Sequence, residues 1–154
     1  MRSSENPVET HPDLYGALIR EISIIHQQFS TRANQDLKNL NLNFSQLSLL
    51  SHMMFLKTPA SITELADQMD LNQPAVTKMV QHLAEQGWIE MQPSPEDARK
   101  KYVVLKEEGR GVFMQAQQAL FPLLQLSFDG MALQEAHLTL HQLQQIRKNL
   151  ARKL

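Results

Sequence analysis

Apolar residues recur every three or four positions over two long stretches, one near each end of the chain. The first runs from residue 13 to about 40 and the second from about 132 to 151. This spacing places the apolar side chains on one face of a helix. The apolar positions are Leu14, Leu18, Ile22, Ile25, Phe29, Ala33, Leu37 and Leu40, then Leu133, Ala136, Leu140, Leu143, Ile146 and Leu150. Each stripe is long for so small a chain and predicts a partner surface that covers it.

A further helical pattern precedes the second of these stretches, over residues 107–130. Val112, Ala116 and Leu123 follow its apolar spacing. Pro122 lies inside the pattern. Because proline lacks the backbone N–H and clashes with the preceding turn, we expect it to kink or end this helix.

Capping residues between the two ends of the chain mark shorter helices. Asn43 is suited to cap the first of them, with Gln46 at the reciprocal position. Ser61 and Glu64 form an S-x-x-E capping box ahead of an apolar run. The second short helix is therefore predicted over residues 62–69.

The last short helix begins directly after a polar turn at residues 70–72. Asn72 is suited to cap it, and Pro74 lies in its first turn, where a missing N–H costs little. Gly87 is expected to end it. Two short helices joined by so short a turn have the outline of a helix-turn-helix.

Two stretches rich in strand-forming residues follow, at 88–91 and 102–105, with a polar, proline-containing segment between them. They predict a β-hairpin with a long tip. The chain is thus expected to be mainly α with one small hairpin. We divide it into an N-terminal arm and long helix (1–42), a central unit (43–106) and C-terminal helices (107–154).

Composition narrows the function by exclusion. The chain has no cysteine, which excludes disulfides, thiolate metal sites and cysteine nucleophiles. No apolar run is long enough for a membrane span, and the polar N-terminus lacks a secretory signal, so the default expectation is a cytoplasmic protein. No nucleophile or phosphate-loop motif appears, and neither an enzyme nor a cofactor is predicted.

The element order and two motifs resemble the winged helix-turn-helix transcription regulators of the MarR family. SITELADQMDLNQPAVTKMVQHLAEQGWI, residues 61–89, is similar to that family's run from the third helix through the recognition helix into the wing. PEDARKKYVVLKEEG, residues 95–109, is similar to its wing motif. Ala98 and Lys106 depart from it, since an arginine and a threonine are frequent there. The resemblance implies a homodimeric regulator, expected to repress at a palindromic operator.

A recognition helix lies in the major groove and turns its solvent face to bases and phosphates. Glutamine amides pair with adenine edges, a threonine hydroxyl meets a phosphate, and lysine takes guanine or phosphate. The residues expected to face DNA are Gln73, Pro74, Thr77, Lys78, Gln81 and His82. The alternative is a helix face that is merely solvated.

The hairpin tip supplies a second set of candidate contacts. Arg99 is expected to enter the minor groove, where a guanidinium meets concentrated negative potential. Lys100 and Lys101 are candidates for phosphate contacts, although strand alternation turns them to opposite sides. Asp97 has the wrong sign for DNA and is expected to support the tip, by pairing with an arginine or capping the turn. A solvated charged loop is the alternative.

Charge and the terminal helices leave further hypotheses open. Residues 57–110 hold seven bases against nine acids, a net charge of −2, so a winged-helix module that binds protein is the alternative function.

Members of the resembled family commonly respond to small molecules, and His26, Ser30, His52 and Met53 are candidates to line such a pocket. His137 and His141, at i and i+4, suit a metal-responsive variant, but their default interpretation is a helix-interface flank and no metal is predicted.

Overall fold

The computed structural model describes residues 11–97 and 99–151. Over these residues the chain forms six helices, one 3₁₀ turn and an antiparallel hairpin, which confirms the expected mainly α fold. The elements are α1 (Pro12–Leu37), η1 (Lys38–Leu40), α2 (Phe44–Met54), α3 (Ile62–Met69), α4 (Gln73–Glu85), β1 (Ile89–Pro93), β2 (Lys101–Leu105), α5 (Glu107–Ser127) and α6 (Leu133–Leu150). Residues 1–10, Ala98 and residues 152–154 lie outside the described part.

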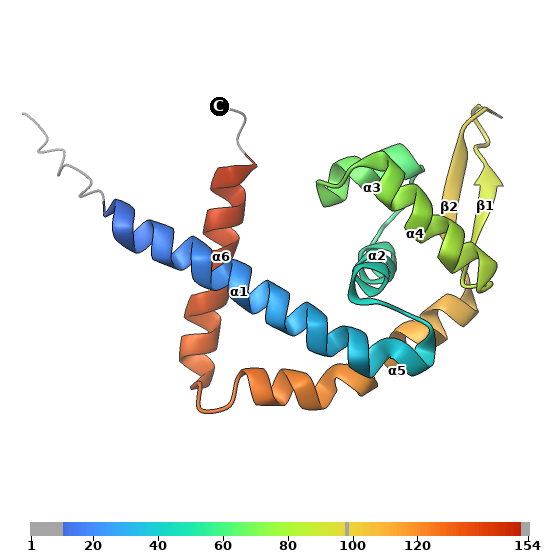
Figure 1. The fold of residues 1–154 in the computed structure, drawn as a ribbon. Coiled ribbons are helices and arrows are strands. Elements are labelled where there is room, and N and C mark those ends of the chain that lie inside the picture. The colour runs from blue at the N-terminus through green and yellow to red at the C-terminus, as the bar shows by residue number, and fades with distance from the viewer. Residues whose placement is uncertain (1–10, 98, 152–154) are drawn as a thin grey trace, which may run out of the picture.

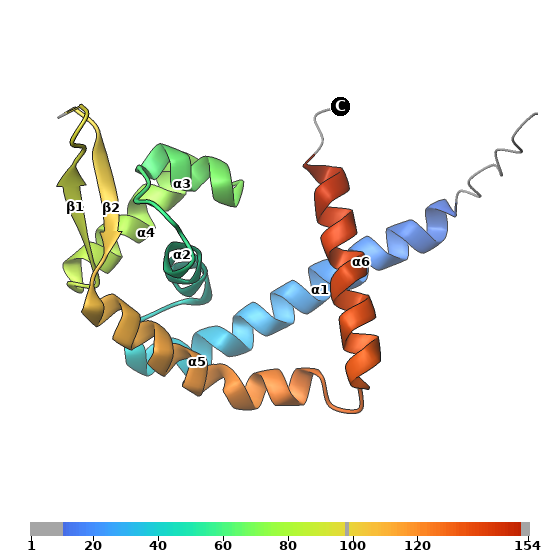
Figure 2. The same cartoon turned by 180° about the vertical axis from the view of Figure 1, so that it is seen from behind.

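Figure 1 shows the central helices and the hairpin grouped on one side of the molecule, with α5 running from their base toward the long terminal helices. Figure 2 shows the same grouping from behind, with α1 and α6 away from the hairpin in both views. The hairpin pairs Ile89 with Leu105 at its base and Pro93 with Lys101 at its far end.

The predicted caps form as hydrogen bonds. The Asn43 Oδ1 atom accepts from the Gln46 backbone N–H at 2.9 Å, and the Gln46 side chain accepts in return from the Asn43 N–H. The Asn72 Oδ1 atom accepts from the Ala75 N–H at 2.8 Å. Each cap satisfies a donor that the first helical turn leaves without an intrahelical partner, which fixes where α2 and α4 begin.

Gly87 ends α4 as the sequence predicts. Its φ is 74°, a left-handed conformation that glycine adopts without steric cost. Its N–H donates to the Ala84 carbonyl at 2.9 Å, and the Trp88 N–H donates to the Leu83 carbonyl at 3.0 Å. This Schellman arrangement directs the chain from α4 into the hairpin.

Pro122 does not end α5, which continues to Ser127. Proline removes one helical hydrogen bond and costs about 3 kcal/mol in a helix interior. Leu120 and Leu123, on either side of it, are both buried in the core. We attribute the continuity of the helix to this burial, since tertiary packing commonly outweighs local propensity.

A single core joins the central unit to the C-terminal end of α1 and to the buried face of α5. Its largest fully buried side chains are Leu37, Leu49, Leu50, Leu65, Leu83, Val76 and Val103. One contact in this core was not predicted from the sequence. The Val103 N–H donates to the Ala60 carbonyl at 2.8 Å, and the segment before α3 thereby forms a β-bridge with β2. The hairpin is thereby tied to the start of the helix-turn-helix.

The terminal helices bury little of their apolar surface. Within α1 only Ala33 and Leu37 are buried, and no residue of α6 is. Large apolar side chains exposed on these helices are Leu14, Tyr15, Leu18, Ile19, Ile24, Ile25, Leu133, Leu138, Leu140, Leu143 and Leu150. None of the helices in the described part is both long and apolar enough to cross a membrane.

Candidate nucleic-acid interface

The packing of α4 fixes which of its faces meets solvent. Val76, Met79, Val80 and Leu83 are buried against the core. The opposite face carries four exposed residues that the sequence assigned to DNA: Gln73, Pro74, Lys78 and Gln81. Because the buried face holds the helix against rotation, these side chains form one continuous strip at its surface.

Thr77 and His82 differ from the other predicted contacts. Thr77 is half-buried, and its hydroxyl donates to the Gln73 carbonyl at 2.9 Å. His82 is also half-buried, and its Nε2 atom lies 2.9 Å from the carbonyl oxygen of Asn41, at the end of η1. The structure therefore joins His82 to the helix junction instead of the exposed strip. Helical periodicity alone could not separate these cases, because both residues border the exposed face.

The tip of the hairpin is held by its own polar groups. The Asp97 Oδ1 atom accepts from the Arg99 backbone N–H at 2.9 Å, and the Asp97 carbonyl accepts from the Lys100 N–H at 2.9 Å. Ser94, a buried polar residue, donates its backbone N–H to the Lys100 carbonyl at 2.8 Å. Of the two roles considered for Asp97, the geometry is that of a turn cap, which leaves the Arg99 side chain exposed.

Lys100 lies close enough to α3 to affect Glu64. The pKa of Glu64 is lowered, first by the hydrogen bond from the Ser61 backbone N–H, then by that from the Ser61 hydroxyl, with a smaller contribution from the Lys100 charge. The Ser61 N–H lies 2.8 Å from the Glu64 carboxylate. Arg99, Lys100 and Lys101 are all exposed and make no ion pair among the described residues.

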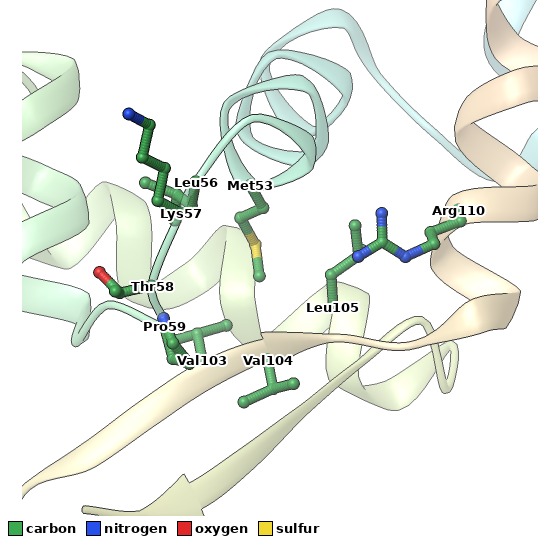
Figure 3. Close-up of a pocket in the computed structure, with 9 residues that line it drawn as sticks. All are labelled: Met53, Leu56, Lys57, Thr58, Pro59, Val103, Val104, Leu105 and Arg110. Carbon is green, nitrogen blue, oxygen red and sulfur yellow. The ribbon is translucent and has the colours of Figure 1, made fainter.

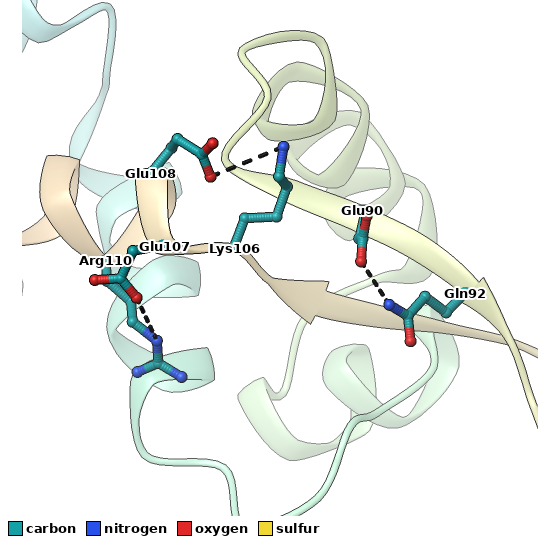
Figure 4. A network of polar contacts seen from close by, with 6 residues as sticks. All are labelled: Glu90, Gln92, Lys106, Glu107, Glu108 and Arg110. Carbon is teal, nitrogen blue, oxygen red and sulfur yellow. Dashed lines mark hydrogen bonds and ion pairs between the residues drawn. The ribbon is translucent and has the colours of Figure 1, made fainter.

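Two further bases, Lys106 and Arg110, lie beside acids at the start of α5 (Figure 4). Lys106 lies 3.8 Å from Glu108, and Arg110 lies 3.9 Å from Glu107. Both pairs are exposed and each contributes little to stability. On the neighbouring strand, the Gln92 amide donates to the Glu90 carboxylate. The bases at the start of α5 therefore lie beside acids, whereas Lys57, Lys78 and the bases at the hairpin tip make no ion pair among the described residues.

The four residues predicted to line a small-molecule pocket have different surroundings. His26 is exposed, with its ring centroid 6.4 Å from that of Phe44. The Ser30 hydroxyl oxygen is buried and has no hydrogen-bond partner among the described residues. His52 lies on α2 with its Nε2 atom 2.8 Å from the Gln68 Oε1 atom, and Met53 is buried.

A cavity of about 180 Å³ lies where the end of α2, strand β2 and the first turn of α5 meet (Figure 3). Of the four residues considered above, only Met53 lines it, and its side chain points from α2 toward β2. The remaining lining residues are Leu56, Lys57, Thr58, Pro59, Val103, Val104, Leu105 and Arg110. Its walls are both polar and apolar, and two of the lining residues, Lys57 and Arg110, carry a positive charge.

His137 and His141 are both exposed on α6. Across residues 11–97 and 99–151, no three side chains of the metal-ligating types gather into one group.

A helix-turn-helix followed by a two-stranded hairpin defines the winged helix-turn-helix class. Residues 43–101 match the family model described as the MarR family. The match covers the helix-turn-helix together with the first strand and the tip of the hairpin, and this part of the chain is similar to the MarR family. The chain is also similar to a curated protein of Bacillus subtilis (strain 168), "Uncharacterized HTH-type transcriptional regulator YwoH", with 31% identity over 91 residues. That match covers 59% of this chain and 65% of the relative, so the chain spans just under two thirds of the relative's length.

Solved structures share the fold over most of the chain. Wild-type MarR from E. coli, in its apo form, is 24% identical, with a TM-score of 0.72 over 90% of this chain and 98% of that one. The regulator BldR from Sulfolobus solfataricus is 24% identical, with a TM-score of 0.75 over 89% and 99%. A mutant E. coli MarR complexed with operator DNA is 22% identical, with a TM-score of 0.75 over 90% and 99%. At these identities the likeness is one of fold.

Proposed function

We propose that this protein is a transcription regulator that binds duplex DNA through its winged helix-turn-helix. The observation that carries the proposal is the exposed strip on α4, whose opposite face is locked into the core, beside a capped hairpin tip that presents Arg99. A rigid helix with a polar outer face fits the major groove. The relative solved with operator DNA has the same fold, which supports this mode of binding.

Each exposed residue has a proposed role. Gln73 and Gln81 read adenine edges, and Lys78 contacts a guanine or a phosphate. Pro74 and Thr77 contact the backbone or a thymine methyl at the start of the helix. In the wing, Arg99 enters the minor groove and Lys101 contacts phosphate, with Asp97 holding the turn. Lys100 is a second candidate for a phosphate contact.

The charge balance bears on the strength of this binding. Residues 57–110 carry a net charge of −2, and the bases at the start of α5 are paired with acids. Nonspecific attraction to DNA is therefore weak, and affinity depends on a few placed contacts. Because each neutralised phosphate adds about 0.9 to the salt slope, we expect a shallow slope per subunit.

We propose that the protein acts as a homodimer on a palindromic operator. The support is the exposed apolar surface of α1 and α6, which the central unit leaves uncovered. Pairing with a second copy buries such stripes and relates the two recognition helices by a twofold axis. Half-sites about 34–36 Å apart follow from that symmetry.

We further propose that the protein represses transcription in the cytoplasm and that a small molecule relieves the repression. The cavity beside Met53 supports a site for it, because it touches α2, the wing strand and α5 at once. A ligand that binds one spacing of the recognition helices better than another shifts the population toward it. Met53 is common to this cavity and to the residues suggested by the sequence; His26, Ser30 and His52 lie outside it.

Selection of random duplexes by the purified protein, followed by sequencing, tests the proposal. Enrichment of a palindrome, bound more weakly as salt rises, is the expected result. Absence of enrichment, together with binding that salt does not change, would contradict it. The negative charge of the unit favours protein interaction as the second candidate, which a specific protein partner at the same α4 strip would support.

A further inference from the structure

His82 connects the recognition helix to the end of α1. Its Nε2 atom lies 2.9 Å from the carbonyl oxygen of Asn41. Asn41 is left-handed, with a φ of 54°, and caps η1, the turn that closes the first long helix. A carbonyl beyond a helix end has no intrahelical donor, so His82 supplies one from another element.

The same imidazole also contacts the base of the hairpin. The ring centroids of His82 and Trp88 are 6.4 Å apart, with the rings inclined at 74° in an edge arrangement. The Trp88 carbonyl accepts from the Lys106 N–H at 2.9 Å. A Cβ atom on Gly109 would lie 2.3 Å from that carbonyl oxygen, so only glycine allows α5 to start this close. Trp88 therefore joins the end of α4 to the start of α5.

His82 thus contacts the segment that follows α1 and, through Trp88, the start of α5. These two helices lead to the exposed apolar faces. We propose that His82 is a positioning residue, which holds the recognition helix at a fixed angle to these helices and so sets the separation of the two recognition helices in the dimer. This inference rests on the proposed function, since it requires a dimer that binds paired half-sites. It assigns His82 a structural coupling instead of a DNA contact.

The two roles for His82 predict different behaviour. A residue that contacts phosphate contributes to every duplex, specific or random, and its loss lowers the salt slope by about one. A residue that fixes helix separation affects only a duplex whose half-sites must both be engaged. Its loss leaves random-duplex affinity and the salt slope unchanged and weakens discrimination between half-site spacings.

Three variants separate the contributions of the imidazole. His82→Ala removes the hydrogen bond and the ring contact, His82→Phe keeps a ring beside Trp88 without a donor, and His82→Gln keeps an N–H donor. Each is measured against the selected palindrome, the same palindrome with one base pair inserted between half-sites, and random duplex. Thermal unfolding of each variant confirms that it is folded.

For His82→Ala we expect palindrome affinity to fall roughly three- to tenfold, the effect of about one net hydrogen bond. Affinity for random duplex should stay within about twofold, so the preference for correct spacing shrinks. His82→Gln should restore most of that preference and His82→Phe should not. An equal loss on all three duplexes with a lower salt slope, or no loss at all, would overturn the inference.

A measurement without DNA keeps this test distinct from that of the proposed function. Because the chain has no cysteine, Glu85→Cys gives one spin-label site per subunit, on the exposed end of α4. We expect a narrow label-to-label distance distribution that broadens with His82→Ala and narrows again with His82→Gln. An unchanged width, or no dipolar coupling in the labelled protein with His82 intact, would overturn the inference. If the width responds but no duplex is preferred, the DNA proposal fails instead.

Discussion

Leucines in the central unit and leucines in the terminal helices have opposite surroundings. Leu65 and Leu83, in the two helices of the helix-turn-helix, are fully buried, whereas Leu133 and Leu150 of α6 are 75% and 77% exposed. The central unit completes its core within one chain, together with the C-terminal end of α1 and the buried face of α5. The terminal helices carry apolar stripes of similar regularity that the described residues 11–97 and 99–151 leave largely uncovered. The same sequence pattern is therefore buried in one region and exposed in the other, where we propose that it forms an association surface.

The largest expected effect falls on the central core. Leu83→Ala should lower the free energy of unfolding by about 2–5 kcal/mol, because it opens a cavity in a fully buried site. Leu138→Ala, at an exposed position of α6 outside the apolar stripe, is the matched control and should change it by less than about 0.5 kcal/mol. Urea unfolding followed by circular dichroism measures both. Equal effects would remove the contrast between the regions.

The next effect concerns association. Leu140→Glu, on the apolar stripe of α6, should weaken the dimer by about 1.5–3 kcal/mol per subunit, the contribution of burying one leucine. Sedimentation equilibrium gives the dimer dissociation constant. Gln145→Glu adds the same charge at an exposed position on the opposite face of α6 and should leave the constant nearly unchanged. A dimer indifferent to Leu140→Glu would place the association surface elsewhere.

A smaller effect is expected in the wing. Arg99→Ala should lose about 1–3 kcal/mol of affinity for the selected palindrome without changing the unfolding midpoint or the dimer constant. Fluorescence anisotropy with a labelled duplex measures the affinity. Lys106→Ala is a control, since Lys106 is already paired with Glu108 away from the tip. Unchanged affinity for Arg99→Ala would refute the minor-groove role.

The smallest effect concerns the cap of α3. The folded pKa of Glu64 is lowered, so its carboxylate adds stability above the ordinary glutamate pKa, and this is lost as pH falls through the lowered value. Glu64→Gln should therefore destabilise the protein at neutral pH, with the difference vanishing at low pH. Paired unfolding curves across that range measure it. A difference independent of pH would show that the charge is not involved.

The helix boundaries could be predicted from the sequence because helix caps depend on residues close together in the chain. The caps at Asn43, Ser61 and Asn72 each depend on residues within three positions, and all three form. Of the two expectations for Pro122, a kink or a helix end, the end is wrong, and we attribute the continuity of α5 to the burial of its neighbours. The bridge between Ala60 and Val103 joins residues far apart in the chain, which no local pattern reports.

The candidate site was predictable as a set of exposed positions but not in its details. Periodicity placed Gln73, Lys78 and Gln81 correctly on the solvent side of α4. It assigned His82 to the same side, because the partner of His82, Asn41, lies in a separate segment that only the tertiary fold brings near. Of the four residues predicted to line a pocket, only Met53 lines the cavity beside β2, because a cavity is formed by elements that the sequence does not order in space.

Comparison of two duplexes tests the central claim most directly: the promoter region next to the gene of this protein, and a random duplex of equal length. Both affinities are measured by anisotropy from about 50 to 200 mM salt, a range over which phosphate contacts change affinity strongly. We predict tighter binding to the promoter duplex, with affinity for both falling as salt rises. Equal affinity for the two duplexes, or affinity that salt does not change, would contradict DNA recognition by this winged helix.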